Sequence, residues 1–222
     1  MAKSRNNVTH DLLQSRRREI IDNALGLLDE VGVDALTMRA LGARMGIQAP
    51  SLYHHFSGKR ELLTAMADRI VADAVIRPDV EDWEAGLRQC AYALRSTLNA
   101  RRDAVRVVAG TAATGPNSAA IAQAWTDALS ATSLPLEECV RFALVLYSFI
   151  LGHMLEEGGE PVTPSEQDSL HTVGPLWRAY LAVAQEGAER RFDFGLDVII
   201  AAIRTRITMA AAPASGARKA DR

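Results

Sequence analysis

The side chains best suited to recognise another molecule lie close together between Thr37 and Lys59, in TMRALGARMGIQAPSLYHHFSGK. Amides and hydroxyls hydrogen-bond to base edges, small apolar groups contact a thymine methyl, and a tyrosine hydroxyl binds phosphate. Arginine can bind a guanine edge through two hydrogen bonds, and lysine can meet phosphate at the start of a helix. These side chains together predict a surface that reads double-stranded DNA. The residues concerned are Arg39, Gln48, Ala49, Ser51, Tyr53, His54 and Lys59.

Two short helices joined by a tight turn at Gly46 are expected to position these side chains. Thr37 is a suitable N-cap for the first of them, which should bury Leu41 and Met45. The second should rest on the first through Leu52, leaving its polar residues in solvent. A helix this short and polar is a poor core element, so an exposed face that reads DNA explains it better.

Helical periodicity continues through the rest of the chain, and no strand pattern longer than a few residues interrupts it. The predicted fold class is therefore all-α, with an N-terminal three-helix helix-turn-helix head and a C-terminal helical domain. Thr163, Pro164, Ser165 and Glu166 form a capping box that should start one of the later helices. The later helices are expected at 82–99, 101–113, 118–131, 135–157, 163–185 and 191–209.

Charge and composition are compatible with this interpretation. The 222 residues are 48% hydrophobic and carry a net charge of −2, but residues 1–60 hold nine Lys/Arg against six Asp/Glu. A basic head on an acidic body suits contact with phosphates. We find no secretory signal and no run near the ~20 apolar residues of a membrane span, so we expect a cytoplasmic protein without a membrane partner. Cys90 and Cys139 lack a CxxC spacing and are expected to be buried free thiols.

The predicted domain organisation has a DNA-binding part and an effector-binding part. Two late helices, 135–157 and 191–209, have more apolar surface than one small domain can hide, which predicts a homodimer. The expected divisions are a disordered basic N-terminus at 1–12, a helix-turn-helix domain at 13–60, a connector helix at 58–76, an effector-binding and dimerisation domain at 77–211 and a flexible tail at 212–222.

The run from Arg18 to Ala65, including LLDEVGVDALTMRALGARMGIQAPSLYHHFSGKRELL, resembles the head of the TetR family of bacterial transcription regulators. The segments DWEAGLRQCAYALR, RRDAVRVVAGT, FILGHMLEE and EGAERRFDFGLDVIIAAI are similar to the C-terminal domain of its tetracycline-repressor subgroup. The resemblance implies a homodimeric repressor on a palindromic operator. It places base contacts at Arg39, Gln48, Ala49, Pro50 and Ser51, and phosphate contacts at Thr37, Tyr53, His55 and Lys59. His54 stands where the subgroup has tryptophan, which predicts a different contacted sequence.

The same resemblance suggests how the effector differs. Subgroup repressors hold a drug–magnesium chelate through a histidine that aligns with Val108, and the drug-contacting positions of one helix align with Cys90 and Leu94. Thr111 and Glu156 are retained, but a hard cation lacking the imidazole would have a poor site. We therefore expect no metal, no cofactor and a small, largely apolar effector. The candidate pocket residues are Cys90, Leu94, Val108, Thr111, Trp125, Phe149, His153 and Glu156.

Other interpretations stay open at this stage. Each pocket candidate could simply pack in the core, and the spacing of His153 and Glu156 could hold zinc, although no third ligand is evident. The chain could also be an effector-independent, constitutive or architectural DNA-binding regulator, which would require a filled C-terminal core. An enzyme is not expected, since the sequence shows no nucleophile–base pair, phosphate-binding loop or metal triad.

Overall fold

The computed structural model describes residues 2–74, 77–79, 81–112, 114–158 and 174–211, and these residues form helices without a strand. The all-α prediction is therefore confirmed. The chain divides into two compact units: unit 1 comprises residues 1–76 and 92–123, and unit 2 comprises 77–91 and 124–222. Residues 92–123 fall in the same unit as the head, and the expected domain boundary near residue 77 stays a prediction.

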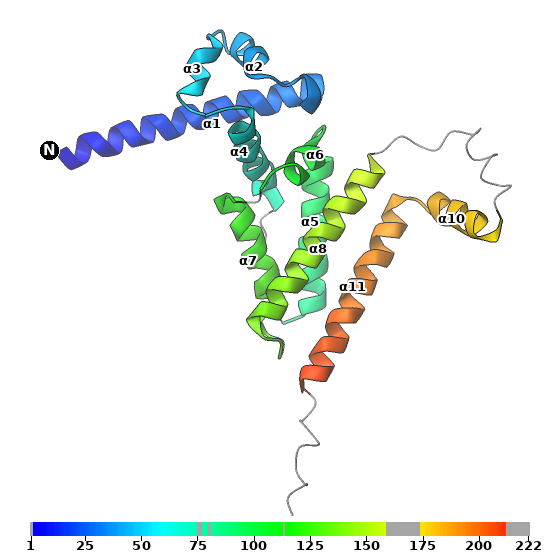
Figure 1. The fold of residues 1–222 in the computed structure, drawn as a ribbon. Coiled ribbons are helices and arrows are strands. Elements are labelled where there is room, and N and C mark those ends of the chain that lie inside the picture. The colour runs from blue at the N-terminus through cyan, green and yellow to red at the C-terminus, as the bar shows by residue number, and fades with distance from the viewer. Residues whose placement is uncertain (1, 75–76, 80, 113, 159–173, 212–222) are drawn as a thin grey trace, which may run out of the picture. The chain divides into compact units, whose positions relative to one another are not determined.

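The head of unit 1 is built from helices α1 to α4, followed by the short 3-10 helix η1 (Figure 1). Their apolar faces meet in a core that includes Ile20, Leu28, Leu41, Leu52 and Phe56. Burial of such side chains stabilises the head by about 1.5–3 kcal/mol each. The helices are α1 (Ala2–Ala35), α2 (Met38–Arg44), α3 (Ala49–Tyr53), α4 (Lys59–Val71) and η1 (Ala72–Ala74).

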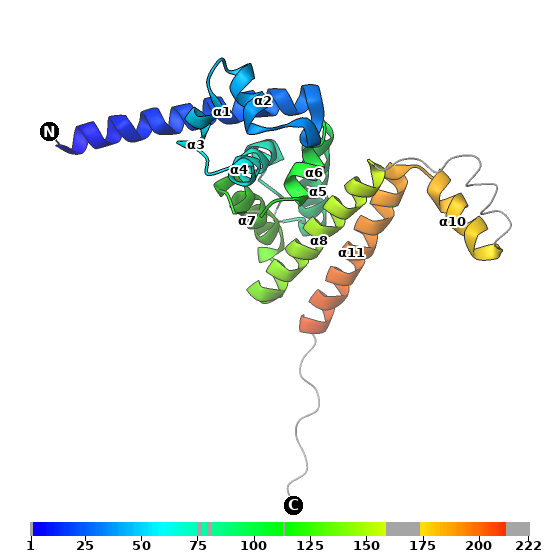
Figure 2. The ribbon, with the colours of Figure 1, turned by 45° about the horizontal axis from the view of Figure 1, so that its top comes forward.

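Helix α1 begins earlier than the sequence pattern indicated. It starts at Ala2, within the stretch 1–12 for which the sequence predicted disorder. Its N-terminal part extends past α3 in both views of the ribbon (Figures 1 and 2). Near its other end, Gly32 has a φ of 79°, a left-handed conformation that interrupts the helical geometry there.

The turn between α2 and α3 follows the predicted chemistry. The Thr37 hydroxyl accepts a hydrogen bond from the Ala40 N–H at 3.1 Å, which caps α2. Gly46 turns the chain with a φ of 66°. Leu41 and Leu52 are fully buried, whereas Met45 is only half-buried and lies at the C-cap of α2. Helix α3 therefore packs on α2 through Leu52, as predicted.

Unit 1 also contains α6 (Ala104–Ala109), the C-terminal part of α5 (Trp83–Asn99) and the N-terminal part of α7 (Pro116–Ser130). Helix α6 packs against α4. Asp103, just before α6, has a φ of 55°, a left-handed conformation that costs a non-glycine residue free energy. The segment 92–123 is therefore held to the head by the packing of α6 against α4.

Unit 2 is built around α8 (Leu136–Glu157) and α11 (Ala188–Ala211), which pack against each other, and also contains α10 (Pro175–Gln185). The Phe149 and Phe192 rings stack between α8 and α11 with centroids 5.4 Å apart. The predicted capping box at 163–166 and the predicted tail at 212–222 lie outside the described residues.

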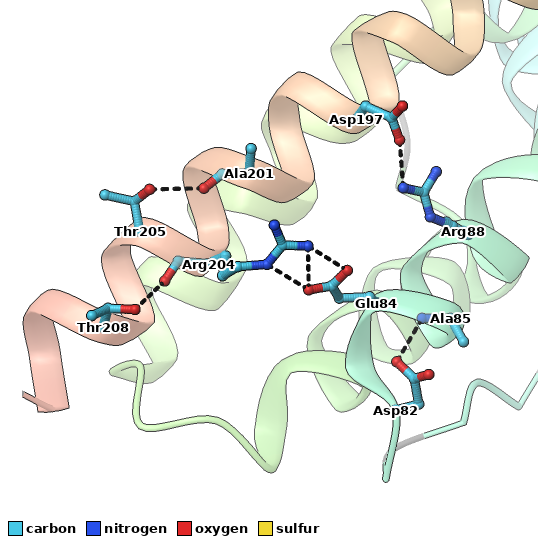
Figure 3. A network of polar contacts seen from close by, with 9 residues as sticks. All are labelled: Asp82, Glu84, Ala85, Arg88, Asp197, Ala201, Arg204, Thr205 and Thr208. Atoms are coloured by element: carbon cyan, nitrogen blue, oxygen red, sulfur yellow. Dashed lines mark hydrogen bonds and ion pairs between the residues drawn. The ribbon is translucent and has the colours of Figure 1, made fainter.

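Polar contacts tie α11 to the N-terminal part of α5 within unit 2 (Figure 3). Arg204 binds Glu84 with two hydrogen bonds, of 2.8 and 2.7 Å. Arg88, four residues after Glu84 on α5, pairs with Asp197, seven residues before Arg204 on α11. Asp82, where the sequence pattern predicted the start of a helix, caps α5 by accepting the Ala85 N–H at 3.0 Å.

Helix α8 is long and apolar enough, by length and composition alone, to cross a membrane, which the sequence pattern had not indicated. A third of its most apolar window is buried within the structure. Core and interface helices of soluble proteins meet the same criterion, so the property by itself says only that α8 needs an apolar environment.

Candidate nucleic-acid interface

The side chains predicted to read DNA form the outer surface of α2 and α3. Leu52 is the buried residue of α3, and the rest of that helix faces outward. The Gln48 amide makes no capping bond to its own helix. Of the predicted set, Ala49, His55 and Lys59 are half-buried, and the exposed members are Thr37, Arg39, Gln48, Pro50, Ser51, Tyr53 and His54.

An ionic contact not anticipated from the sequence fixes the end of α3. Arg17 donates hydrogen bonds to the His55 carbonyl and, at 2.9 Å, to the Glu61 carboxylate. Its guanidinium lies 4.1 Å from the centroid of the Phe56 ring. The Ser57 N–H and Arg17 together lower the pKa of Glu61 to about 2. The run SRRR at 15–18 was the signal for this contact, although the sequence could not indicate which arginine turns inward.

Besides its predicted contact with phosphate, Lys59 makes a hydrogen bond within the head. Its ammonium donates a hydrogen bond of 3.0 Å to the Val33 carbonyl, which links the start of α4 to the end of α1. An ammonium has three donors, so this bond leaves capacity for a phosphate oxygen. Lys59 therefore also holds α4 to α1 within the head.

The end of α1 is bound to α6 by several contacts, which we call the α1–α6 clasp (Val33, Asp34, Asp103 and Arg106). Asp34 accepts two hydrogen bonds of 3.0 Å from Arg106. The Val33 N–H donates to the Asp103 carboxylate at 2.8 Å. The hydrogen bonds from Arg106 lower the pKa of Asp34. A displacement of α6 would therefore also displace the end of α1 that is bound to it.

A second link joins α4 to the start of α7 within unit 1. The Asp68 carboxylate accepts the N–H groups of Asn117 and Ser118 at 3.0 and 2.9 Å. A carboxylate at the N-terminus of a helix is favoured by the free N–H groups and the helix dipole. The sequence showed an acidic residue on α4 and a helix break at Gly115–Pro116. It did not indicate that this carboxylate would bind the start of α7.

The eight candidate effector residues are divided between the two units. Leu94, Val108 and Thr111 belong to unit 1, and the other five belong to unit 2. The Thr111 hydroxyl donates to the Val107 carbonyl at 3.0 Å, within its own helix. Thr111, Phe149 and His153 are half-buried, Glu156 is exposed, and the buried members are Cys90, Leu94, Val108 and Trp125.

His153, whose spacing from Glu156 could have suited a metal, makes its contacts with other groups. The His153 Nε2 atom lies 2.9 Å from the Glu157 carboxylate and 3.0 Å from the Ala188 carbonyl at the start of α11. Glu156, one residue earlier on α8, points into solvent. Within the described part of the chain, no three His, Cys, Asp or Glu side chains cluster as metal ligands would.

A polar groove of about 470 Å³ lies in unit 1, away from the predicted pocket residues. Carboxylates and guanidinium groups line much of it, in contrast to the apolar site expected for an effector. Its lining residues are Asp22, Leu25, Gly26, Asp29, Arg69, Ile70, Asp73, Ser96, Thr97, Ala100 and Arg101.

The cysteines are placed as predicted, buried and free. Burial raises the pKa of the Cys90 thiol to about 12. The thiol is therefore protonated at neutral pH and serves as a small apolar group, since nucleophilic chemistry would need the thiolate.

Comparison with known proteins gives matches along nearly the whole chain. Residues 20–66 match the family model described as "Bacterial regulatory proteins, tetR family", and residues 77–207 match "Tetracyclin repressor-like, C-terminal domain". The class A tetracycline repressor protein from transposon 1721 of Escherichia coli is 36% identical over 213 residues, which are 91% of this chain and 96% of that protein.

Solved structures give the same relationship. A possible TetR family transcriptional regulator from Streptomyces coelicolor A3(2) is 34% identical with a TM-score of 0.72, over 85% of this chain and 98% of that one. ActR of Streptomyces coelicolor, in complex with actinorhodin, is 27% identical with a TM-score of 0.73, over 86% and 97% of the two chains. These similarities include both the α2–α3 surface and the helices that follow it.

Proposed function

This chain belongs to the tetR family of bacterial regulatory proteins, and from that membership we propose that it is a ligand-responsive transcriptional repressor. It binds a palindromic operator as a dimer in the cytoplasm and is released by a small, largely apolar effector. The observation that supports the DNA-binding role most directly is the exposed polar surface of α2 and α3 on a buried Leu52 anchor.

We assign the base contacts to Arg39 on α2 and to 48–51 at the start of α3. The N-terminal residues of a recognition helix are those that reach base edges in the major groove. Phosphate contacts fall to Thr37, Tyr53, His55 and Lys59, which lie around this surface, and His54 lies beside them. The contacts that hold Lys59 to Val33 and His55 to Arg17 support this role, because preorganised side chains lose less entropy on binding.

The dimer is supported by apolar side chains that unit 2 leaves exposed on α8 and α11. A soluble chain rarely leaves many large apolar groups on adjacent helices in water. A two-fold axis through these helices would set two heads at half-sites about 34–36 Å apart on the operator. The exposed residues are Leu136, Val140, Leu144, Val145, Leu155, Phe194, Val198 and Met209.

Effector control would act through the contacts that join the head to α6 and α7. The α1–α6 clasp and the Asp68 link connect α1 and α4 to the segment that carries Val108 and Thr111. An effector that moves α6 would therefore change the orientation of the head. By linkage, operator DNA must weaken effector binding by the same factor.

An effector-independent regulator is the alternative, and one observation favours it. Cys90, Leu94, Val108 and Trp125 are all nearly fully buried, as they would be in a filled core. The two possibilities separate in a thermal-shift screen with apolar compounds followed by operator release. A compound that stabilises the protein and releases the operator supports the repressor, whereas the alternative predicts no such compound.

Arg39→Ala should weaken operator binding by about 1–3 kcal/mol and relax one base position, because a guanidinium bound to a base edge is worth that much discrimination. Fluorescence anisotropy on the operator and on its single-base variants measures both effects. Arg60→Ala, a similarly exposed arginine outside the predicted base contacts, is the control. Unchanged affinity and unchanged base preference in Arg39→Ala would rule out the base contact.

Magnesium-tetracycline should not release the operator at micromolar concentration. Val108 is 3% exposed and offers no ligand atom in the position that aligns with the metal-binding histidine of tetracycline repressors. The class A tetracycline repressor on its own operator is the positive control for release. Release of this protein by the same complex would show that the Val108 assignment is wrong.

A further inference from the structure

We propose that Arg17 and Glu61 are positioning residues for the reading of DNA bases. They hold the end of α3 in place, so base selection depends on two side chains outside the predicted set of DNA contacts. We call Arg17, Glu61 and the His55 carbonyl the α3 end cap. The proposal rests on the proposed DNA-binding function and deepens it, since it concerns what orients the same surface.

Helix α3 is too short to fix its own direction. It contains five residues, Ala49–Tyr53, whereas isolated helices of fewer than about 12 residues are marginal in water. Its start is fixed by close packing, because a Cβ on Gly42 of α2 would lie 3.2 Å from the Ala49 nitrogen. Leu52 is its one buried residue, and a single buried side chain still lets the helix pivot. Contacts at its far end must therefore set the direction of its exposed side chains.

The Arg17 guanidinium makes three contacts just beyond that end. It donates hydrogen bonds to the His55 carbonyl and, at 2.9 Å, to the Glu61 carboxylate. It also lies 4.1 Å from the centroid of the Phe56 ring, which is fully buried and so offers a fixed support. A cation beside the carbonyls at a helix C-terminus is favoured by their free lone pairs and by the helix dipole. Arg17 therefore links α1 to the end of α3.

Glu61 connects the same contact to the start of α4. One carboxylate oxygen accepts the Arg17 hydrogen bond, and the other accepts the Ser57 N–H at 2.7 Å. The Ser57 N–H and Arg17 lower the pKa of Glu61 to about 2, so the carboxylate is ionised at neutral pH. The backbone between α3 and α4 is thus held at the His55 carbonyl and at the Ser57 N–H. Both contacts meet at one ion pair.

A direct contact between Arg17 and a DNA phosphate is the alternative. The Arg17 side chain is 33% exposed, and a guanidinium has five N–H donors, so it could accept a phosphate as a further partner. Glu61 argues for the positioning role, because a carboxylate near the DNA-reading surface repels phosphates and weakens binding electrostatically. Its presence is explained if it holds Arg17 and Ser57. The two roles predict different results when either charge is changed.

The test compares Arg17→Lys, Arg17→Gln and Glu61→Ala with the matched controls Arg16→Lys, Arg16→Gln and Glu19→Ala. Arg16 and Glu19 pair with each other at 2.7 Å within α1. Lysine keeps the charge of Arg17 but lacks the planar fork that binds two acceptors while it stacks on a ring. Fluorescence anisotropy at about 50–200 mM salt measures the affinity for the operator and for its single-base variants at the positions read by 48–51. Circular dichroism checks that each variant is folded.

We expect Arg17→Lys and Glu61→Ala to bind the operator about tenfold more weakly, and their discrimination against single-base variants to fall from about tenfold to about twofold. The salt slope of Arg17→Gln should stay at the wild-type value, because no phosphate contact is lost. Combining Arg17→Lys with Glu61→Ala should add little to either change, since both act through one contact. The controls should keep wild-type affinity and discrimination.

Three results would overturn the α3 end cap. Wild-type discrimination in Arg17→Lys, with a salt slope lower by about one unit in Arg17→Gln, would mean that Arg17 binds phosphate directly. Tighter binding by Glu61→Ala with unchanged discrimination would mean that its charge acts only at a distance. Equal weakening on every duplex would mean that the contact serves stability alone, because a smaller folded fraction lowers all affinities without changing their ratio.

The wild-type protein separates this inference from the proposed function. If it selects no duplex sequence, the repressor proposal fails and the α3 end cap fails with it. If it selects the operator and the Arg17 and Glu61 variants select it equally well, only the α3 end cap fails.

Discussion

Replacing both Leu144 and Phe194 by aspartate should convert the proposed dimer to a monomer and lower operator affinity at least about 100-fold. These side chains are 61% and 72% exposed in the single chain, on α8 and α11. Unit 2 should therefore still fold. In a two-fold interface each carboxylate appears twice and would be buried without a partner, at a cost of several kcal/mol per charge. The loss in affinity follows because a monomer presents one head to a two-site operator.

Sedimentation velocity gives the oligomeric state, and anisotropy on full and half operators gives the affinities. Circular dichroism should show unchanged helix content, because neither position contributes to the core of the single chain. Leu12→Asp, a leucine of similar exposure on α1, is the control for the oligomeric state. A double variant that still sediments as a dimer would exclude α8 and α11 as the interface.

Gly42→Val should destabilise the head by about 2–3 kcal/mol and abolish specific operator binding. A Cβ at this position would lie 2.9 Å from the Ile47 carbonyl oxygen and 3.2 Å from the Ala49 nitrogen. Both atoms belong to the backbone that leads into α3, so no side-chain rotation relieves the clash. Helix α3 must move away from α2, and the base-reading surface moves with it.

Helix propensity alone predicts the opposite sign, because valine is a better helix former than glycine by a few tenths of a kcal/mol. The neighbouring Ala43→Val is the matched control, since Ala43 is exposed in the same helix. Chemical unfolding of the two variants, together with their operator affinities, separates packing from propensity. A Gly42→Val protein as stable as the wild type would mean that α2 and α3 are not as closely packed as described.

Local signals in the sequence predicted several of the helices and caps that the structure contains. Apolar spacing predicted the helices, Thr37 and Asp82 were found as the N-caps that their types suggested, and Gly46 takes the left-handed turn. These features succeed because a helix and its caps depend on residues within about four positions of one another. The resemblance of the head and C-terminal segments to the TetR family was likewise visible in the residues alone.

Contacts between distant residues were not predicted from the sequence. The Ala188 carbonyl at the start of α11 lies 3.0 Å from the His153 Nε2 atom, and the sequence did not indicate this partner. The start of α1 at Ala2 was not predicted, because the sequence AKSRNNVTHD has no apolar stripe with helical spacing.

By itself the sequence determined that this protein is all-helical, which residues face outward on α2 and α3, and which family it joins. Only the tertiary structure decided how those parts are connected: which arginine contacts the end of α3, and which carboxylates bind α6 and α7 to the head. Such contacts join residues from about 40 to 70 positions apart, including Arg17 with Glu61 and Asp34 with Arg106. Their formation requires that whole helices already be packed, because the charge of a side chain does not specify its partner.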